Sequence, residues 1–138
     1  MHRRLIAVGI AAGMSVLGLA LAKYGAELQA ADRIGPLGLG AATLIWWGLG
    51  TTLAAAATGE LRWGVVACVL MVVVHSWLGN AVISSVHDGP WTLDPFEPPY
   101  YVLRALQMNL VLGVIPGVAG SVLGRAIAGF RGIGVKID

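Results

Sequence analysis

Apolar residues run almost unbroken through four stretches of this chain, and the charged residues gather between them. The stretches cover residues 5–22, 37–57, 64–86 and 102–124, so each holds 18 to 23 residues. An α-helix rises about 1.5 Å per residue, and about 20 residues therefore cross the hydrocarbon core of a bilayer. The pattern predicts an all-α integral membrane protein, a bundle of four transmembrane helices arranged as antiparallel hairpins.

The composition supports this class. Hydrophobic residues make up 57% of the 138 residues and charged residues 12%, where soluble domains have about 25% charged residues. Because the four stretches occupy most of the length, we expect one membrane domain over residues 1–138 and no soluble domain. The net charge of +2 comes mostly from the segment ends, which argues against a nucleic-acid partner.

The basic residues are distributed unevenly along the chain. Six of the nine Lys and Arg lie before the first stretch, in the link 58–63 or in the tail 125–138. The loop 87–101 has none of them and carries three acids, four prolines and four aromatic residues. The positive-inside rule then predicts that both termini are cytoplasmic and that this loop is external. The tail would meet the anionic inner leaflet, and the loop would lie on the membrane surface or against a partner.

The first stretch has a second interpretation. Two arginines, an apolar run and the sequence Ala20-Leu21-Ala22 are also typical of a cleaved secretory signal. The run of 18 residues is long for a signal, and the Gly9-x-x-x-Gly13 spacing suits a packed transmembrane helix. We therefore expect the first span to be retained, with cleavage before Lys23 as the alternative.

Polar residues inside the spans are costly in lipid and are therefore the first candidates for function. The first two spans contain no acid, base or amide. In the last two spans, residues at similar depth predict a polar seam in the outer half of the bilayer, formed by Asn80, Ser84, Arg104, Gln107 and Asn109. Such a seam either holds the two helices together through hydrogen bonds or forms a small entry site for an ion or solute.

The fourth span also carries a face of small residues. They recur every three or four positions, at Gly113, Gly117, Gly120 and Gly124. This spacing allows two helix backbones to approach closely, and Pro116 on the same face should bend the helix. The pattern predicts a helix-packing face that is buried against another helix, either of this chain or of a partner.

Two further features were weighed as ligand sites. Trp46 and Trp47 lie in the middle of the second span, where they either fill space against small neighbours or form a platform for a ligand. His75 lies near the centre of the third span, about 10.5 Å along the helix from Cys68, too far for both to bind one metal. We therefore predict no metal, cofactor or catalytic residue, and a neutral His75 hydrogen-bonded to a neighbouring helix.

The expected function follows from these observations. Glycine-rich faces, an aromatic outer loop and the lack of an intramembrane acid favour a non-enzymatic accessory subunit of a larger membrane assembly. Its partners would be lipid and other membrane protein chains, either copies of itself or different proteins. A small oligomeric channel or transporter that uses the polar seam is the alternative. Small multidrug transporters need a carboxylate in the first span, and this chain has none there.

Overall fold

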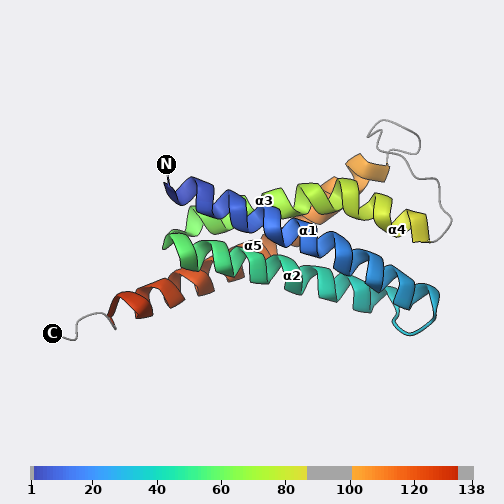
Figure 1. The fold of residues 1–138 in the computed structure, drawn as a ribbon, viewed down its shortest axis with the longest axis horizontal. Coiled ribbons are helices and arrows are strands. Elements are labelled where there is room, and N and C mark those ends of the chain that lie inside the picture. The colour runs from blue at the N-terminus through green and yellow to red at the C-terminus, as the bar shows by residue number, and fades with distance from the viewer. Residues whose placement is uncertain (1, 87–100, 134–138) are drawn as a thin grey trace.

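The structure, a computed structural model, describes residues 2–86 and 101–133, and these are helical except at the short connections 31–35 and 59–60 (Figure 1). Four long helical segments form an elongated bundle, and each is long and apolar enough to cross a membrane. The elements are α1 (His2–Ala30), α2 (Pro36–Thr58), α3 (Leu61–Val74), the π-helical segment η1 (His75–Gly79), α4 (Asn80–Val86) and α5 (Tyr101–Ile133). This arrangement confirms the predicted all-α four-helix bundle. The expectations for the loop 87–101 fall almost entirely outside the described residues.

Two helices are longer than the apolar stretches predicted. The prediction placed a polar loop at 23–36, but α1 continues to Ala30 and only residues 31–35 connect it to α2. Residues 26–30 read Ala-Glu-Leu-Gln-Ala, which are good helix formers, so the helix extends past the apolar run. Likewise α5 continues to Ile133, about 13 Å beyond Gly124, and projects past the rest of the bundle (Figure 1).

Local signals explain both ends of α2. Pro36 occupies the first turn, where its missing N–H costs no hydrogen bond. Gly59 ends the helix in the left-handed conformation, with φ of 70°, and its N–H donates to the Ala55 carbonyl at 2.8 Å. Since residues with a Cβ rarely adopt this conformation, glycine permits the tight reversal into α3.

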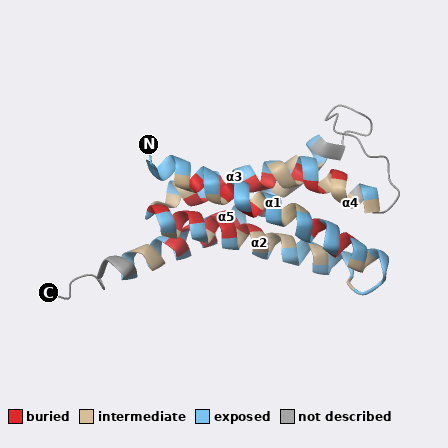
Figure 2. Cartoon of the chain, viewed as in Figure 1, coloured by how far each residue is buried: buried red, intermediate tan, exposed pale blue. Residues whose placement is uncertain are grey.

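The two halves of the bundle pack differently. We call the half in which α1 begins and α5 leaves the bundle the closed half (residues 2–14, 47–58, 61–72 and 113–124), and the remainder the open half (residues 15–30, 36–46, 75–86 and 101–112). Figure 2 shows buried positions facing between the helices and exposed ones facing outward. Many exposed positions carry Leu, Val or Ile, as expected for a surface that meets lipid tails.

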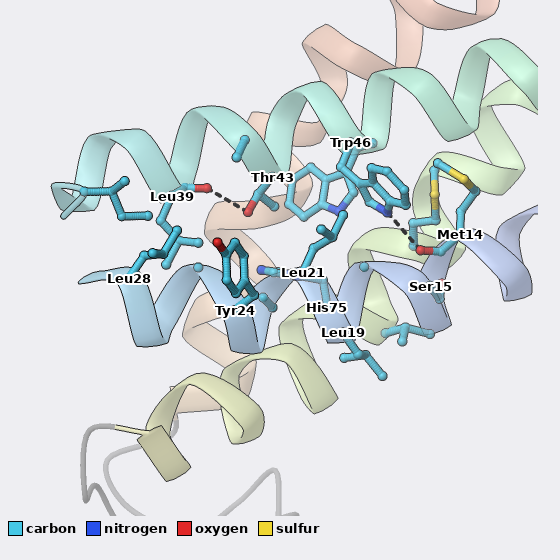
Figure 3. Close-up of a pocket in the computed structure, with 18 residues that line it drawn as sticks. Met14, Ser15, Leu19, Leu21, Tyr24, Leu28, Leu39, Thr43, Trp46 and His75 are labelled. Carbon is cyan, nitrogen blue, oxygen red and sulfur yellow. Dashed lines mark hydrogen bonds between the residues drawn. The ribbon is translucent and has the colours of Figure 1, made fainter. Parts of the chain in front are cut away.

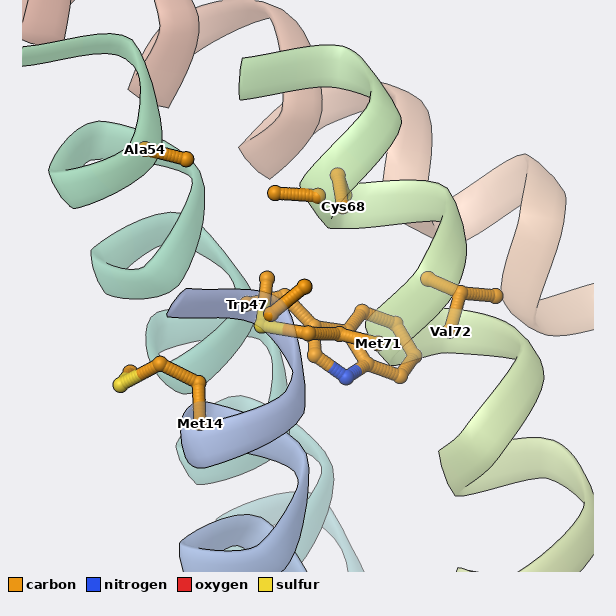
Figure 4. Close-up of a cluster of buried hydrophobic side chains, with 8 residues drawn as sticks. Met14, Trp47, Ala54, Cys68, Met71 and Val72 are labelled. Carbon is orange, nitrogen blue, oxygen red and sulfur yellow. The ribbon is translucent and has the colours of Figure 1, made fainter. Parts of the chain in front are cut away.

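The core cluster lies in the closed half. Met71 and Val72 of α3 are almost fully buried, and they pack with Trp47 of α2 and Met14 of α1 (Figure 4). Alanines fill the remaining positions. Because these side chains are small, the helix backbones approach closely.

The α5 glycines make the closest of these approaches. All four residues of the predicted helix-packing face are buried inside this chain, against α2 and α3. A Cβ on Gly120 would lie 2.7 Å from the Gly48 carbonyl oxygen, and one on Gly124 would overlap the carbonyl oxygen of Thr52. Gly113 and Gly117 face Val72 and Cys68 in the same way. The face is therefore used within the chain.

Candidate functional site

The open half contains two adjoining cavities. The helices spread apart toward this end of the bundle, where α1 remains packed against η1 and α4 (Figure 1). One cavity of about 210 Å³ lies between α1, α2 and the third span, and a wider one of about 490 Å³ lies between α2, the third span and α5. Four residues line both cavities: Leu39, Thr43, Trp47 and His75. None of the described residues that line either cavity is Asp, Glu, Lys or Arg.

His75 begins the π-helical segment that interrupts the third span. A π-turn contains one residue more than an α-turn and occurs frequently at functional sites. The imidazole lies over Gly79, one turn further along, where a Cβ would come within 2.8 Å of Nδ1. Glycine at 79 therefore lets the ring lie close to its own helix. Figure 3 shows the His75 side chain among the residues that surround the smaller cavity.

His75 meets an aromatic ring and no hydrogen-bonding group in the described part of the chain. Its imidazole contacts Trp47 edge-on, with 5.4 Å between ring centroids and 83° between the planes. Trp47 is 2% exposed, so its neighbours hold the ring that His75 contacts in a fixed position. The expected hydrogen bond from His75 to a neighbouring helix is not formed by any residue that the structure describes. Because His75 lines both cavities, its imidazole can meet a molecule there.

Trp46 closes the cavity between α1 and α2. Its indole Nε1 donates a hydrogen bond to the backbone carbonyl of Met14 at 2.8 Å (Figure 3). A Cβ on Gly18 would lie 2.9 Å from that nitrogen, so glycine leaves room for the indole. The mid-span tryptophan pair thus has two roles: Trp46 joins two helices, and Trp47 fills the core while also lining the cavities.

Part of the predicted polar seam converges on Ser76. Asn109 of α5 donates its side-chain amide to the Ser76 hydroxyl at 3.0 Å, and Asn80 donates to the Ser76 carbonyl at 2.8 Å. The hydroxyl itself donates to the Val72 carbonyl at 2.7 Å. The bond from Asn109 joins α5 to the third span at the level of the π-helical segment, and the other two lie within the third span. Asn109 also lines the wider cavity.

Other members of the predicted seam lie elsewhere. Gln107 and Arg104 are exposed, and neither lines a cavity. Since a helix turns about 100° per residue, Gln107 projects roughly 200° away from Asn109. These residues were placed in one seam because they lie at similar depth along the helix, but their side chains project in different directions. The side chain of Ser84 is outside the described part of the structure.

A charged cluster lies at the end of the closed half. Arg3 and Arg62 both form ion pairs with Glu60 in the link between α2 and α3. Their hydrogen bonds to the carboxylate hold the Glu60 pKa below its usual range. The guanidinium groups of Arg4 and Arg62 also lie over the Trp63 ring, at 5.9 and 5.3 Å from its centroid. This cluster fastens the start of α1 to the α2–α3 link.

The described residues contain no group of three His, Cys, Asp or Glu side chains that could hold a metal ion. Cys68 is buried and donates to the Gly113 carbonyl at 3.5 Å, so it belongs to the α3–α5 contact. The cavity itself was not predicted from the sequence. Its signal was present in the small residues Gly18 and Gly79 beside the large rings, but periodicity alone does not show where helices separate.

The comparisons with known proteins give no further guidance. The chain matches no protein-family model, no curated protein and no solved structure.

Proposed function

We propose that this protein is a non-enzymatic accessory subunit that packs into a larger membrane assembly, with both termini in the cytoplasm. The exposed amide of Gln107 carries the proposal. It projects from the outward face of α5, among apolar residues such as Val111 and Ile115.

The depth of Gln107 makes that exposure costly. Asn109 is hydrogen-bonded to Ser76, which lies ten residues, or about 15 Å, below the outer end of α4. Gln107 is two residues nearer that end, so it lies about 12 Å below it, within the span. An amide at this depth is stabilised by a hydrogen bond to another helix, and a neighbouring chain can supply one.

A second surface supports the same proposal. Gly9 and Gly13 of α1 are exposed, and a Cβ on either would meet no atom within 4 Å. The α5 glycines are already covered within the chain, whereas this pair leaves a shallow surface that a neighbouring helix can approach. Two separate faces are thus suited to partners, as an assembly subunit requires.

The mass of the intact protein in native-lipid nanodiscs tests the proposal. We expect an assembly larger than one chain, and we expect Gln107→Leu to shift it toward the single chain. Met108→Leu is the matched control, because Met108 is equally placed at the surface, with 60% exposure, and carries no hydrogen-bonding amide. A single chain without a partner, in wild-type and variant alike, would contradict the proposal.

A small channel or transporter is the second candidate. The observation that favours it is the wider cavity, which reaches Asn109 from the α2 side. Against it, Asn80 and Asn109 already hydrogen-bond to Ser76, which suits a structural role. Solute flux into liposomes that disappears with Asn109→Leu, a change in the lining of that cavity, would favour transport over the subunit proposal.

A further inference from the structure

We propose that the smaller cavity binds a neutral, lipid-soluble ring compound that carries a carbonyl oxygen, the chemistry of an isoprenoid quinone, with His75 as its hydrogen-bond donor. This inference is independent of the accessory-subunit proposal. It concerns the interior of the open half, and Gln107, Gly9 and Gly13 have no part in it.

The entrance to the cavity selects a molecule that is dissolved in the membrane. Leu21 and Tyr24 of α1 both line the cavity and are exposed, by 47% and 59%. The opening therefore lies on the side of the bundle, between α1 and α2, where a spanning protein meets lipid (Figure 3). A ligand can enter from the bilayer without crossing water.

The lining selects a neutral molecule. Its surface is overwhelmingly apolar, and the described residues that form it include no acid, lysine or arginine. A fatty acid carboxylate or a phospholipid head group would lose its hydration there without gaining an opposite charge. Ligand pockets of this kind are typically apolar, with a few polar groups that fix the orientation of the ligand.

The aromatic residues and His75 select a ring with an oxygen acceptor. Trp46 and Trp47 form rigid walls, because one indole is hydrogen-bonded to Met14 and the other is buried in the core. Rings pack favourably against such surfaces. A neutral imidazole has one N–H donor, and no described residue accepts it, so a ligand carbonyl can do so. The deep position of His75 places that carbonyl near the centre of the span.

The cavity volume sets where the rest of the molecule lies. About 210 Å³ is below the usual range for drug-sized ligands, so it suits a single substituted ring. An isoprenoid tail would leave through the side opening between Leu21 and Tyr24 and lie in the lipid.

Tryptophan fluorescence provides the test. The full-length protein in nanodiscs of quinone-free phospholipid is titrated with decylubiquinone, which quenches nearby indoles. We expect saturable quenching in the wild type. His75→Leu should weaken binding about tenfold, because it removes the hydrogen-bond donor, whereas His75→Gln should retain most of the affinity. Trp63→Phe, at the far end of the bundle, should leave the titration curve unchanged apart from its amplitude.

A second variant separates ligand binding from folding. Ala22→Leu places a larger side chain at a buried position in the cavity wall and should abolish saturation while the helical content and thermal unfolding remain at least as in the wild type. Quenching that rises only with the quinone content of the membrane, equally in all variants, would overturn the proposal. Displacement of decylubiquinone by cholesterol at equal concentration would also overturn it, since a sterol offers no carbonyl.

Discussion

The closed and open halves of the bundle are built from the same four helical segments, but one half is closely packed and the other contains cavities. In the closed half, glycine and alanine let α5 rest directly on α2, with Gly120 against the Gly48 carbonyl. In the open half, large rings such as Trp46 and His75 lie between the helices and line a cavity. Small residues therefore let two membrane helices approach closely only where they face one another. Where glycine faces a ring, as Gly18 faces Trp46, it makes room for the ring instead.

The largest effect should come from filling the closed half. Gly124→Ala places a Cβ against the Thr52 carbonyl and should cost about 2–3 kcal/mol, because two backbones must separate. Gly129→Ala is the matched control on the same helix, since no atom lies within 4 Å of its added Cβ. Reversible unfolding in bicelles measures both variants. Equal stabilities would show that the α5 glycines are not packed as described.

An enlarged side chain in the open half should raise the free energy of unfolding instead of lowering it. Ala22→Leu projects into existing space and should stabilise the bundle by about 0.5–2 kcal/mol, as cavity-filling changes commonly do. The same unfolding assay provides the measurement. A loss as large as that of Gly124→Ala would mean that the open half is packed as tightly as the closed half.

A smaller effect is expected where the halves meet. Asn109→Leu removes the hydrogen bond to the Ser76 hydroxyl and should cost about 0.6 kcal/mol, the average for such bonds between membrane helices. Ser76→Ala in the same background should add little further loss. A double-mutant cycle measures this coupling, and strictly additive losses would show that the two side chains act independently.

The smallest effect concerns the charged end of the closed half. Because Arg3 and Arg62 lower the Glu60 pKa, this carboxylate stabilises the folded state above the ordinary glutamate pKa of about 4.3. That contribution should disappear as the pH falls through the lower pKa of the folded state. Glu60→Gln should lack this acid-dependent part of the stability. Thermal unfolding between neutral and acidic pH would reveal it, and parallel curves for both proteins would contradict the ion pairs.

Much of the fold could be predicted from the sequence, because four apolar runs of sufficient length admit few arrangements. The helix ends could not, since the extension of α1 to Ala30 depends on helix propensity in a segment that hydropathy classes as loop. The burial of Gly120 and Gly124 was predicted from their spacing, but spacing does not reveal whether the covering helix belongs to the same chain.

The candidate site was less predictable. Asn80 and Asn109 of the predicted seam both hydrogen-bond to Ser76. The bond from Asn80 lies within one helix, whereas the bond from Asn109 depends on how α5 is rotated against the third span. Gln107 was grouped with them by depth and projects away. The cavity depends on the separation of helices and on a change of helical period at His75, and neither leaves a regular pattern in the sequence.

That change of period has a consequence for how related chains should be aligned. The turn from His75 to Gly79 holds one residue more than an α-turn, so a relative that lacks one residue there can keep α3 and α4 in place with an ordinary helix. The residue numbering of α3 and that of α4 can therefore shift by one relative to each other without moving either helix. An alignment that allows a single gap between them will compare equivalent positions on both sides.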